Sequence, residues 1–226
     1  IRTNGLHFQK YRMQSKVILT VTGALILIPT IYFFLFEFTQ APMGERVLLS
    51  FFQAVTPRTA GFNTADLSSM TEVGQAIMIL LMLMGGSPSS TAGGMKTTTV
   101  AVLLLNAFAT FRSREDAGAF GRRFDSQVIK NAATIAMLYF VLFFFGGITI
   151  SVYEGLSLQL CLYEAASAVG TVGLTLGITP GLHILSRLIL IVLMYLGRVG
   201  GLTLIYAVVS RGNTNAKMPL EKITVG

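Results

Sequence analysis

Charged side chains are scarce in this chain of 226 residues. Asp, Glu, Lys and Arg together make up 12% of it, about half of the share that is usual in soluble domains. Hydrophobic residues make up 53%, and the mean hydropathy is +0.68. This composition argues against one large soluble core and favours a chain embedded in a lipid bilayer.

Cysteine and histidine are nearly absent. A lone cysteine, Cys161, excludes an internal disulfide, and its apolar neighbours favour a packing role. The two histidines, His7 and His183, are predicted to lie on loops on opposite sides of the membrane, too far apart for a metal site. No Ser/His/Asp grouping is credible inside the membrane, which argues against an intramembrane protease and against an enzyme in general.

The first residues, Ile1-Arg2-Thr3, include no initiator methionine, and no signal peptide precedes the first apolar run. We therefore expect a further part of the same polypeptide upstream. The polar residues 217–222 after the last apolar run fit a natural terminus.

Two apolar runs are long enough to cross a bilayer. Residues 17–36 carry no charge over 20 positions, which corresponds to about 30 Å of helix. Residues 131–153 form a second run of this kind. Between these runs, residues 45–56 are predicted to form a helix of only about 18 Å, which enters the membrane and stops. Residues 57–64 then return as non-helical backbone, which is tolerated at membrane depth only inside protein or along a watery path.

Glycines interrupt the next apolar segment. Residues 71–111 would make a straight helix of about 60 Å, twice the bilayer thickness. Residues 85–94, GGSPSSTAGG, hold four glycines and a proline, which disfavour a helix. We therefore predict a loop inside the membrane there.

The second half repeats this order. The strip Thr171-Val172-Gly173-Leu174 lies 112 positions after Thr59-Ala60-Gly61-Phe62, and it follows a short predicted helix, residues 156–168. A closing helix over 181–210 carries a gentler interruption at 197–201. Because both copies start and end on the same side, they are parallel repeats about an axis along the membrane normal. The predicted parts are a cytoplasmic segment (1–16), a first repeat (17–111), a cytoplasmic linker (112–127), a second repeat (128–211) and a cytoplasmic tail (212–226).

Basic residues support this topology. Twelve of the 17 lie within residues 1–16, 112–130 or 211–226, at or beyond the ends of the spans, and the positive-inside rule places these segments in the cytoplasm. The net charge is +7, but the basic residues lie at the ends of membrane spans and form no groove. No nucleic-acid partner is therefore expected.

Four motifs carry a family resemblance: TPRTAGFNT (56–64), GGSPSSTAGGMKTTT (85–99), GTVGLTLGITPGL (170–182) and LMYLGRVGGLTL (193–204). In their order and spacing they resemble the Trk/Ktr/HKT superfamily of potassium transporters, most closely the membrane subunit of Ktr systems. The resemblance implies an all-α membrane protein of the plasma membrane, in which four helix–pore loop–helix repeats surround a central pore. This chain is similar to the third and fourth repeats. The resemblance also implies an N-terminal half with two further repeats, a homodimer, a cytosolic nucleotide-binding regulatory ring, potassium as the transported ion and sodium as a stimulating ion.

By the same resemblance, Gly61 and Gly173 match the selectivity glycines. Backbone carbonyl groups can replace the water shell of a potassium ion, and the C-terminal ends of the two short helices would point their partial negative charge at it. The positions assigned to this filter are Thr59, Ala60, Gly61, Phe62, Asn63, Thr171, Val172, Gly173 and Leu174.

The glycine-rich loop matches the family segment that gates the path below the filter. A nucleotide P-loop is excluded, because Met95 separates Gly94 from Lys96 and no strand precedes it. Tight packing of small residues against a neighbouring helix is the alternative role. The positions assigned to the gate are Gly85, Gly86, Ser87, Ser90, Gly93, Gly94 and Arg198.

Arg198 lies in an apolar run, where a basic side chain costs roughly 2.5–3.5 kcal/mol. The 112-residue offset places it at the depth of Gly86, so we expect it to bond the loop carbonyls or to act as a fixed positive charge; a purely structural ion pair is the alternative. Arg58 and Glu164 are also anomalous, and they pair either with each other or with the other half of the protein. Lys96 either lines the inner vestibule or reaches the headgroups.

Potassium translocation through a filter is the function that the sequence favours. The main alternative is a secondary transporter with a substrate site at the broken helix, although that class usually has inverted repeats. A membrane module that only packs through small residues is a further alternative.

Overall fold

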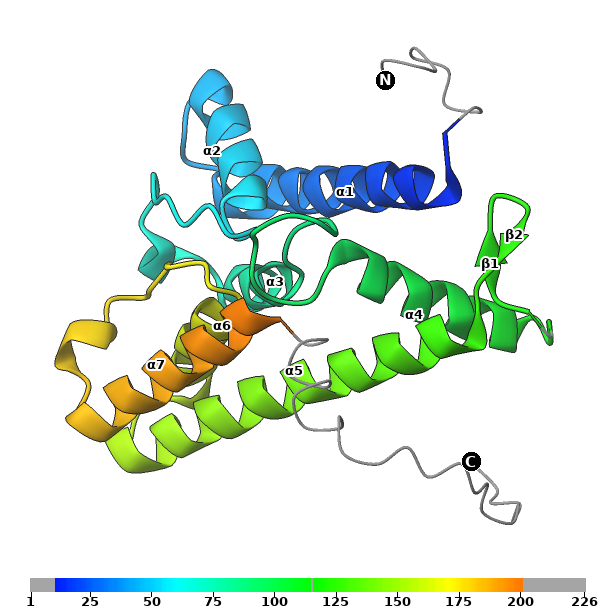
Figure 1. Ribbon diagram of the computed structural model, residues 1–226. Helices are drawn as coiled ribbons and strands as arrows, with labels where there is room; N and C mark the ends of the chain where they lie inside the picture. Colours follow the sequence, from blue (N-terminus) through cyan, green and yellow to red (C-terminus); the bar gives the residue numbers. More distant parts are fainter. Residues whose placement is uncertain (1–10, 115, 201–226) are drawn as a thin grey trace, which may run out of the picture.

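The computed structural model describes residues 11–114 and 116–200, which are mostly helical (Figure 1). One two-stranded hairpin is formed by β1 (Gly118–Ala119) and β2 (Arg122–Arg123). The α-helices are α1 (Met13–Tyr32), α2 (Met43–Val55), α3 (Glu72–Leu83), α4 (Thr97–Phe111), α5 (Ser126–Glu154), α6 (Leu158–Val169) and α7 (Ile184–Val199). Short turns of other helix types are η2 (Phe33–Glu37), η3 (Leu67–Ser69) and η4 (Thr179–Gly181).

The same order of elements occurs twice in the described residues. A long helix, α1 with η2 or α5, is followed by a short one, α2 or α6, then by a non-helical strip and a further helix. By length and composition, Met13–Glu37 and Ser126–Glu154 are apolar enough to cross a membrane. The short helices have 13 and 12 residues, which is about 18–20 Å and too short to cross.

Helix α6 lies at the centre of the packing. It contacts α3, α5 and α7, and its side chains from Tyr163 to Val169 are all buried. Two adjacent glycines of α5 make this close packing sterically feasible. An added Cβ at Gly147 would collide with Leu162 of α6, and one at Gly146 would collide with Leu193 of α7. Small residues at such positions let helix backbones approach closely.

The segment between α3 and α4 is non-helical from Met84 to Lys96, and it contains residues 85–94, where the glycines predict a loop. Its two ends meet. Met84 and Met95 form an isolated parallel bridge, and the amide N of Met95 donates to the carbonyl O of Leu83 at 3.0 Å. We call residues 84–96 the broken segment. Its closed base joins the end of α3 to the start of α4, while the loop itself stays outside any helix.

The closing helix breaks within the interruption that the sequence predicts at residues 197–201. Helix α7 begins at Ile184 and ends at Val199, because Gly200 leaves the helix with φ +86°. Positions 201–210 of the predicted helix, and the predicted tail 212–226, lie outside the described residues, as does most of the predicted segment 1–16.

The β-hairpin was not predicted within the linker 112–127. It packs beside the end of α4 (Figure 1). Lys16, near the start of α1, lies 5.6 Å from the ring centroid of Phe120 in the hairpin turn. The start of α1, the end of α4 and the hairpin therefore lie at one end of the molecule. Many of the basic residues of the described chain gather there.

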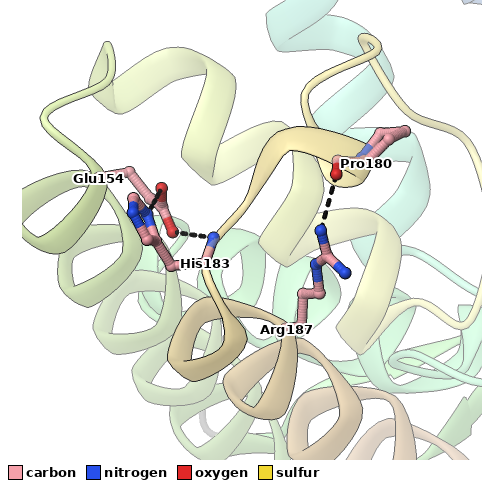
Figure 2. A network of polar contacts seen from close by, with 4 residues as sticks. All are labelled: Glu154, Pro180, His183 and Arg187. Carbon is pink, nitrogen blue, oxygen red and sulfur yellow. Dashed lines mark hydrogen bonds and ion pairs between the residues drawn. The ribbon is translucent and has the colours of Figure 1, made fainter.

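A polar clasp joins α5 and α7 at the opposite end (Figure 2). The Glu154 carboxylate accepts a hydrogen bond from the backbone N of His183 at 2.9 Å and lies 2.7 Å from its Nδ1. Arg187 Nη2 donates to the carbonyl O of Pro180 at 2.7 Å. His183 is thus a structural contact at the start of α7, consistent with its predicted loop position.

Candidate functional site

The two strips have the same unusual backbone. Thr59 and Gly61 have φ of +64° and +75°, and Thr171 and Gly173, 112 positions later, have φ of +52° and +93°. L-residues rarely adopt positive φ, and threonine does so at a cost of about 1–2 kcal/mol. A strained conformation that occurs twice at equivalent positions points to a functional constraint on both strips.

In both strips, backbone amide groups donate hydrogen bonds within the protein, but most backbone carbonyl groups accept none from the described residues. The amide N of both Ala60 and Gly61 donates to the carbonyl O of Thr56 at 3.1 Å, and the amide N of Val172 donates to that of Ser167 at 2.9 Å. Among the described residues, by contrast, the carbonyl groups of 59–61 and 171–174 accept no hydrogen bond. The strips thus satisfy amide donors within the fold and leave acceptors free, which is the arrangement that suits a cation.

The strips also lie against each other. A Cβ added at Gly61 would collide with the carbonyl O of Val172. The carbonyl of one strip therefore faces the glycine of the other, although the two are more than 100 residues apart in the sequence.

The first strip is braced by Thr56 at the end of its short helix. Thr56 Oγ1 donates to the carbonyl O of Phe62 at 2.5 Å, so this predicted ligand is engaged within the protein. Asn63 Oδ1 accepts a hydrogen bond from Ala65 N at 3.3 Å and shapes the turn that follows. Further along, the hydroxyl and amide of Ser68 hold the pKa of Asp66 below its usual range.

The second strip is braced by a buried carboxylate. Glu164 of α6 is only 4% exposed. Its Oε1 accepts from Thr175 Oγ1 at 2.5 Å and from Leu176 N at 3.1 Å, and its Oε2 accepts from Thr179 Oγ1 at 2.7 Å. These bonds offset the cost of burying the charge. The Glu164 carboxylate thereby fixes the chain just after the strip.

The direct ion pair between Arg58 and Glu164, one of the two predicted alternatives, is not formed in the described structure. Glu164 is occupied by the hydroxyl and amide donors, while Arg58 Nη2 lies 3.5 Å from the carbonyl O of Gly85. Arg58 thus reaches from the first strip to the broken segment. The partners of Glu164 are hydroxyl groups of Thr175 and Thr179, just after the second strip. A search of the sequence for residues of opposite charge could not identify them.

The broken segment lies against the second strip. A Cβ added at Gly93 would collide with the side chain of Thr171, and one at Gly85 would collide with the carbonyl O of Gly93. Two more of the predicted gate residues form a turn, in which Ser90 N donates to Ser87 O at 3.1 Å. The carbonyl O of Gly86 accepts from Thr97 N at 3.1 Å, and Gly94 has φ +69°.

Lys96 holds this loop in place. Its Nζ donates to the carbonyl O of Ala92 at 2.6 Å and to that of Ser90 at 3.2 Å. The ammonium group is therefore turned back onto the loop, and the two predicted roles of Lys96, lining the inner vestibule or reaching the headgroups, stay predictions. Lys96 does line a cavity of about 510 Å³ beneath the loop, together with Tyr139 and Arg198.

Arg198 borders two cavities. One is the cavity that it shares with Lys96, and the other, of about 580 Å³, lies beside the second strip and is lined by Thr171, Gly173 and Glu164. Within the described part of the chain, Arg198 donates no hydrogen bond to the loop carbonyls. Lys96 makes those bonds instead. The sequence could have indicated the bond between Lys96 and the carbonyl O of Ala92, because the two residues are only four positions apart.

Comparison with known proteins identifies the family. Residues 10–216 match the family TrkH, described as a cation transport protein. The chain belongs to this family. It is 36% identical to the potassium/sodium uptake protein NtpJ of Enterococcus hirae over 96% of the chain, and 33% identical to the Ktr system potassium uptake protein B of Bacillus subtilis over 97%. The chain spans 51% of the length of each of these relatives.

The fold agrees with this assignment. The potassium transporter TrkH of Vibrio parahaemolyticus superposes with a TM-score of 0.69 at 20% identity, over 86% of the chain and 44% of that protein. These relatives are transporters and not enzymes. The family is one of membrane transport proteins, and the resemblance of the chain to the membrane subunit of Ktr systems is confirmed by its similarity to the Ktr protein B.

Proposed function

We propose that this chain forms half of a pathway for potassium ions across the plasma membrane, with residues 59–62 and 171–174 as two of four strips of a selectivity filter. The carbonyl groups of residues 59–61 and 171–174, which accept no hydrogen bond within the described residues, carry this proposal. A row of acceptors with no internal donor suits a dehydrated cation. The names of the relatives, potassium uptake and potassium/sodium uptake proteins, support potassium as the transported ion. Sodium as a stimulating ion is proposed on the family resemblance.

The broken segment and Arg198 are proposed as the gate. The broken segment packs against Thr171, the first residue of the second strip, and Arg198 borders both the cavity beside the strip and the cavity that is lined by the loop. A positive charge between two cavities opposes the passage of a cation until the loop and the arginine move apart.

The proposed topology places residues 1–16, 112–127 and 212–226 in the cytoplasm. It is supported by Arg12, Lys16, Arg112 and the hairpin arginines, which lie near the inner ends of α1 and α4. An upstream half with two further repeats is supported by the relatives, of which this chain spans half. The homodimer and the cytosolic nucleotide-binding ring are proposed on the family resemblance.

The test is rubidium and sodium uptake by the full-length transporter, expressed in cells that lack potassium uptake. We expect saturable rubidium uptake in the wild type and a loss of preference for rubidium over sodium in Gly173→Ser. This position suits the test better than Gly61, because nothing lies within 4 Å of an added Cβ there, so the strain of φ +93° is the local cost of the substitution. An unchanged uptake ratio in a correctly inserted Gly173→Ser protein would remove Gly173 from the filter. A secondary transporter with its site at residues 85–94 would instead lose selectivity only in variants of that loop.

A further inference from the structure

A cavity of about 510 Å³ lies between the end of α4 and the β-hairpin. Arg112, Arg114, Arg122 and Arg123 all line it. The proposed ion pathway does not use this cavity, which is at the opposite end of α4 from the broken segment (Figure 1).

Positive charge dominates the cavity. Arg123 pairs with Asp116 at 3.4 Å, but both side chains are largely exposed, and such pairs contribute little. Within the described residues, the guanidinium groups of Arg112, Arg114 and Arg122 make no hydrogen bond or ion pair. Across residues 112–123 the sequence has four arginines against Glu115 and Asp116, a net charge of 4 − 2 = +2. Guanidinium groups bind phosphate through paired N–H donors.

The other wall of the cavity is apolar. It includes Leu105 and Phe108 of α4 and Phe120 of the hairpin turn, and Phe108 is 62% exposed. A ligand made only of phosphate would leave these side chains in water. A phosphate joined to a hydrocarbon chain would contact both walls.

The hairpin turn holds Phe120 in a costly conformation. Phe120 and Gly121 both have positive φ, +52° and +75°, as in a type I′ turn, where asparagine and glycine are the preferred residues. An aromatic residue at such a position is strained, and strain of this kind collects at binding sites. Here it places a half-exposed ring in the lining of the cavity.

We propose that this cavity binds the headgroup of an anionic phospholipid. Arg112 and Arg122 would contact the phosphate, and Phe108 and Phe120 would contact the start of the acyl chains. The proposal requires only that the chain lies in a membrane, as its family does. Binding measured in detergent does not depend on the direction of the pore or on its selectivity, so this proposal can fail while the proposed function stands.

The test is native mass spectrometry of the full-length transporter in detergent, titrated with phosphatidylglycerol or with phosphatidylcholine of the same acyl chains. We expect tighter binding of phosphatidylglycerol, and a loss of about 25-fold in the double variant Arg112→Gln/Arg122→Gln, since each arginine contributes roughly fivefold. The matched control is Arg12→Gln/Lys130→Gln, which removes two exposed charges that do not line the cavity. It should change binding by no more than about twofold.

Three outcomes would overturn the proposal: equal losses in the two double variants, equal binding of the two lipids by the wild type, or full displacement of phosphatidylglycerol by millimolar inorganic phosphate. The last would assign the arginines to a soluble anion. A thermal unfolding curve of each variant shows whether it is folded, and Phe120→Gly, which relieves the positive φ, should keep the fold while weakening lipid binding.

Discussion

The two strips share a backbone but differ in what supports them. The second follows α6, which is buried against three other helices, and it is held by the carboxylate of Glu164 and the hydroxyl of Ser167. The first follows α2, which packs mainly on α1 and η2, and it is held by the single hydroxyl of Thr56.

Two strips with the same sequence motif and backbone can therefore be supported by different numbers of helices and side chains. Within the described structure, the second strip lies at the centre of the packing and the first at its edge, with Phe62 72% exposed. Under the proposed four-repeat arrangement, the missing half would complete the surroundings of the first strip. The following variants probe the inequality, beginning with the largest expected effect.

Gly61 and Gly173 should not be equivalent. Gly61→Ala places a methyl group against the carbonyl of Val172, whereas nothing lies within 4 Å of a Cβ added at Gly173. Both variants have the strain of positive φ, about 1–2 kcal/mol, but only Gly61→Ala adds a collision with backbone. We expect Gly61→Ala to abolish selective rubidium uptake and Gly173→Ala to reduce it. Gly23→Ala in α1, which also has open space, is the neutral control. Equal losses of selective rubidium uptake in Gly61→Ala and Gly173→Ala would show that the two glycines are equivalent.

Removing the braces should expose the same asymmetry in stability. Glu164→Ala removes the charged acceptor of three hydrogen bonds, from Thr175, Thr179 and the amide of Leu176, each worth about 1.5–3 kcal/mol. Thr56→Val removes one hydrogen bond, about 0.5–1.5 kcal/mol. Thermal unfolding of the purified full-length transporter should therefore show a larger fall for Glu164→Ala. Glu164→Gln keeps one acceptor oxygen, so its unfolding temperature should lie between those of the other two variants. A larger fall for Thr56→Val would contradict the idea that the second strip has the stronger support.

The broken segment distinguishes the two repeats further, because α7 continues as a helix to Val199 at the equivalent depth. Lys96→Met removes two hydrogen bonds from the loop carbonyls, each worth about 1.5–3 kcal/mol as a bond to a charged donor. We expect basal rubidium flux to rise severalfold, with Lys96→Arg nearer to the wild type. Arg198→Ala should also raise flux, through loss of charge rather than of loop contacts. Wild-type flux in a well-expressed Lys96→Met protein would show that the loop is not the gate.

The smallest effect is expected at the outer clasp. His183→Ala removes the ring contact to Glu154 but keeps the backbone N–H that Glu154 also accepts (Figure 2). Because the His183 side chain is 70% exposed, the loss should stay below about 1 kcal/mol. Thermal unfolding of the full-length protein measures it, and a fall as large as that of Glu164→Ala would place the clasp among the main supports of the second strip.

Much of the fold was predictable because the signals are local. The glycines and the proline of residues 85–94 predict the break between α3 and α4. The apolar runs before each strip predict one long and one short helix. The β-hairpin was missed because its strands are two residues long and its turn lacks the usual asparagine. The partner of Glu164 was also missed, since hydroxyl donors carry no charge pattern.

The sequence by itself determined the repeat, because the 112-residue offset places threonine and glycine at equivalent positions whatever surrounds them. Only the tertiary structure decided how each strip is held and which cation contacts the loop. Lys96 rather than Arg198 bonds the loop carbonyls because the end of the broken segment turns the lysine back over it, while α7 holds the arginine between two cavities. Spacing sets what can recur along a chain, but contacts between distant segments depend on packing.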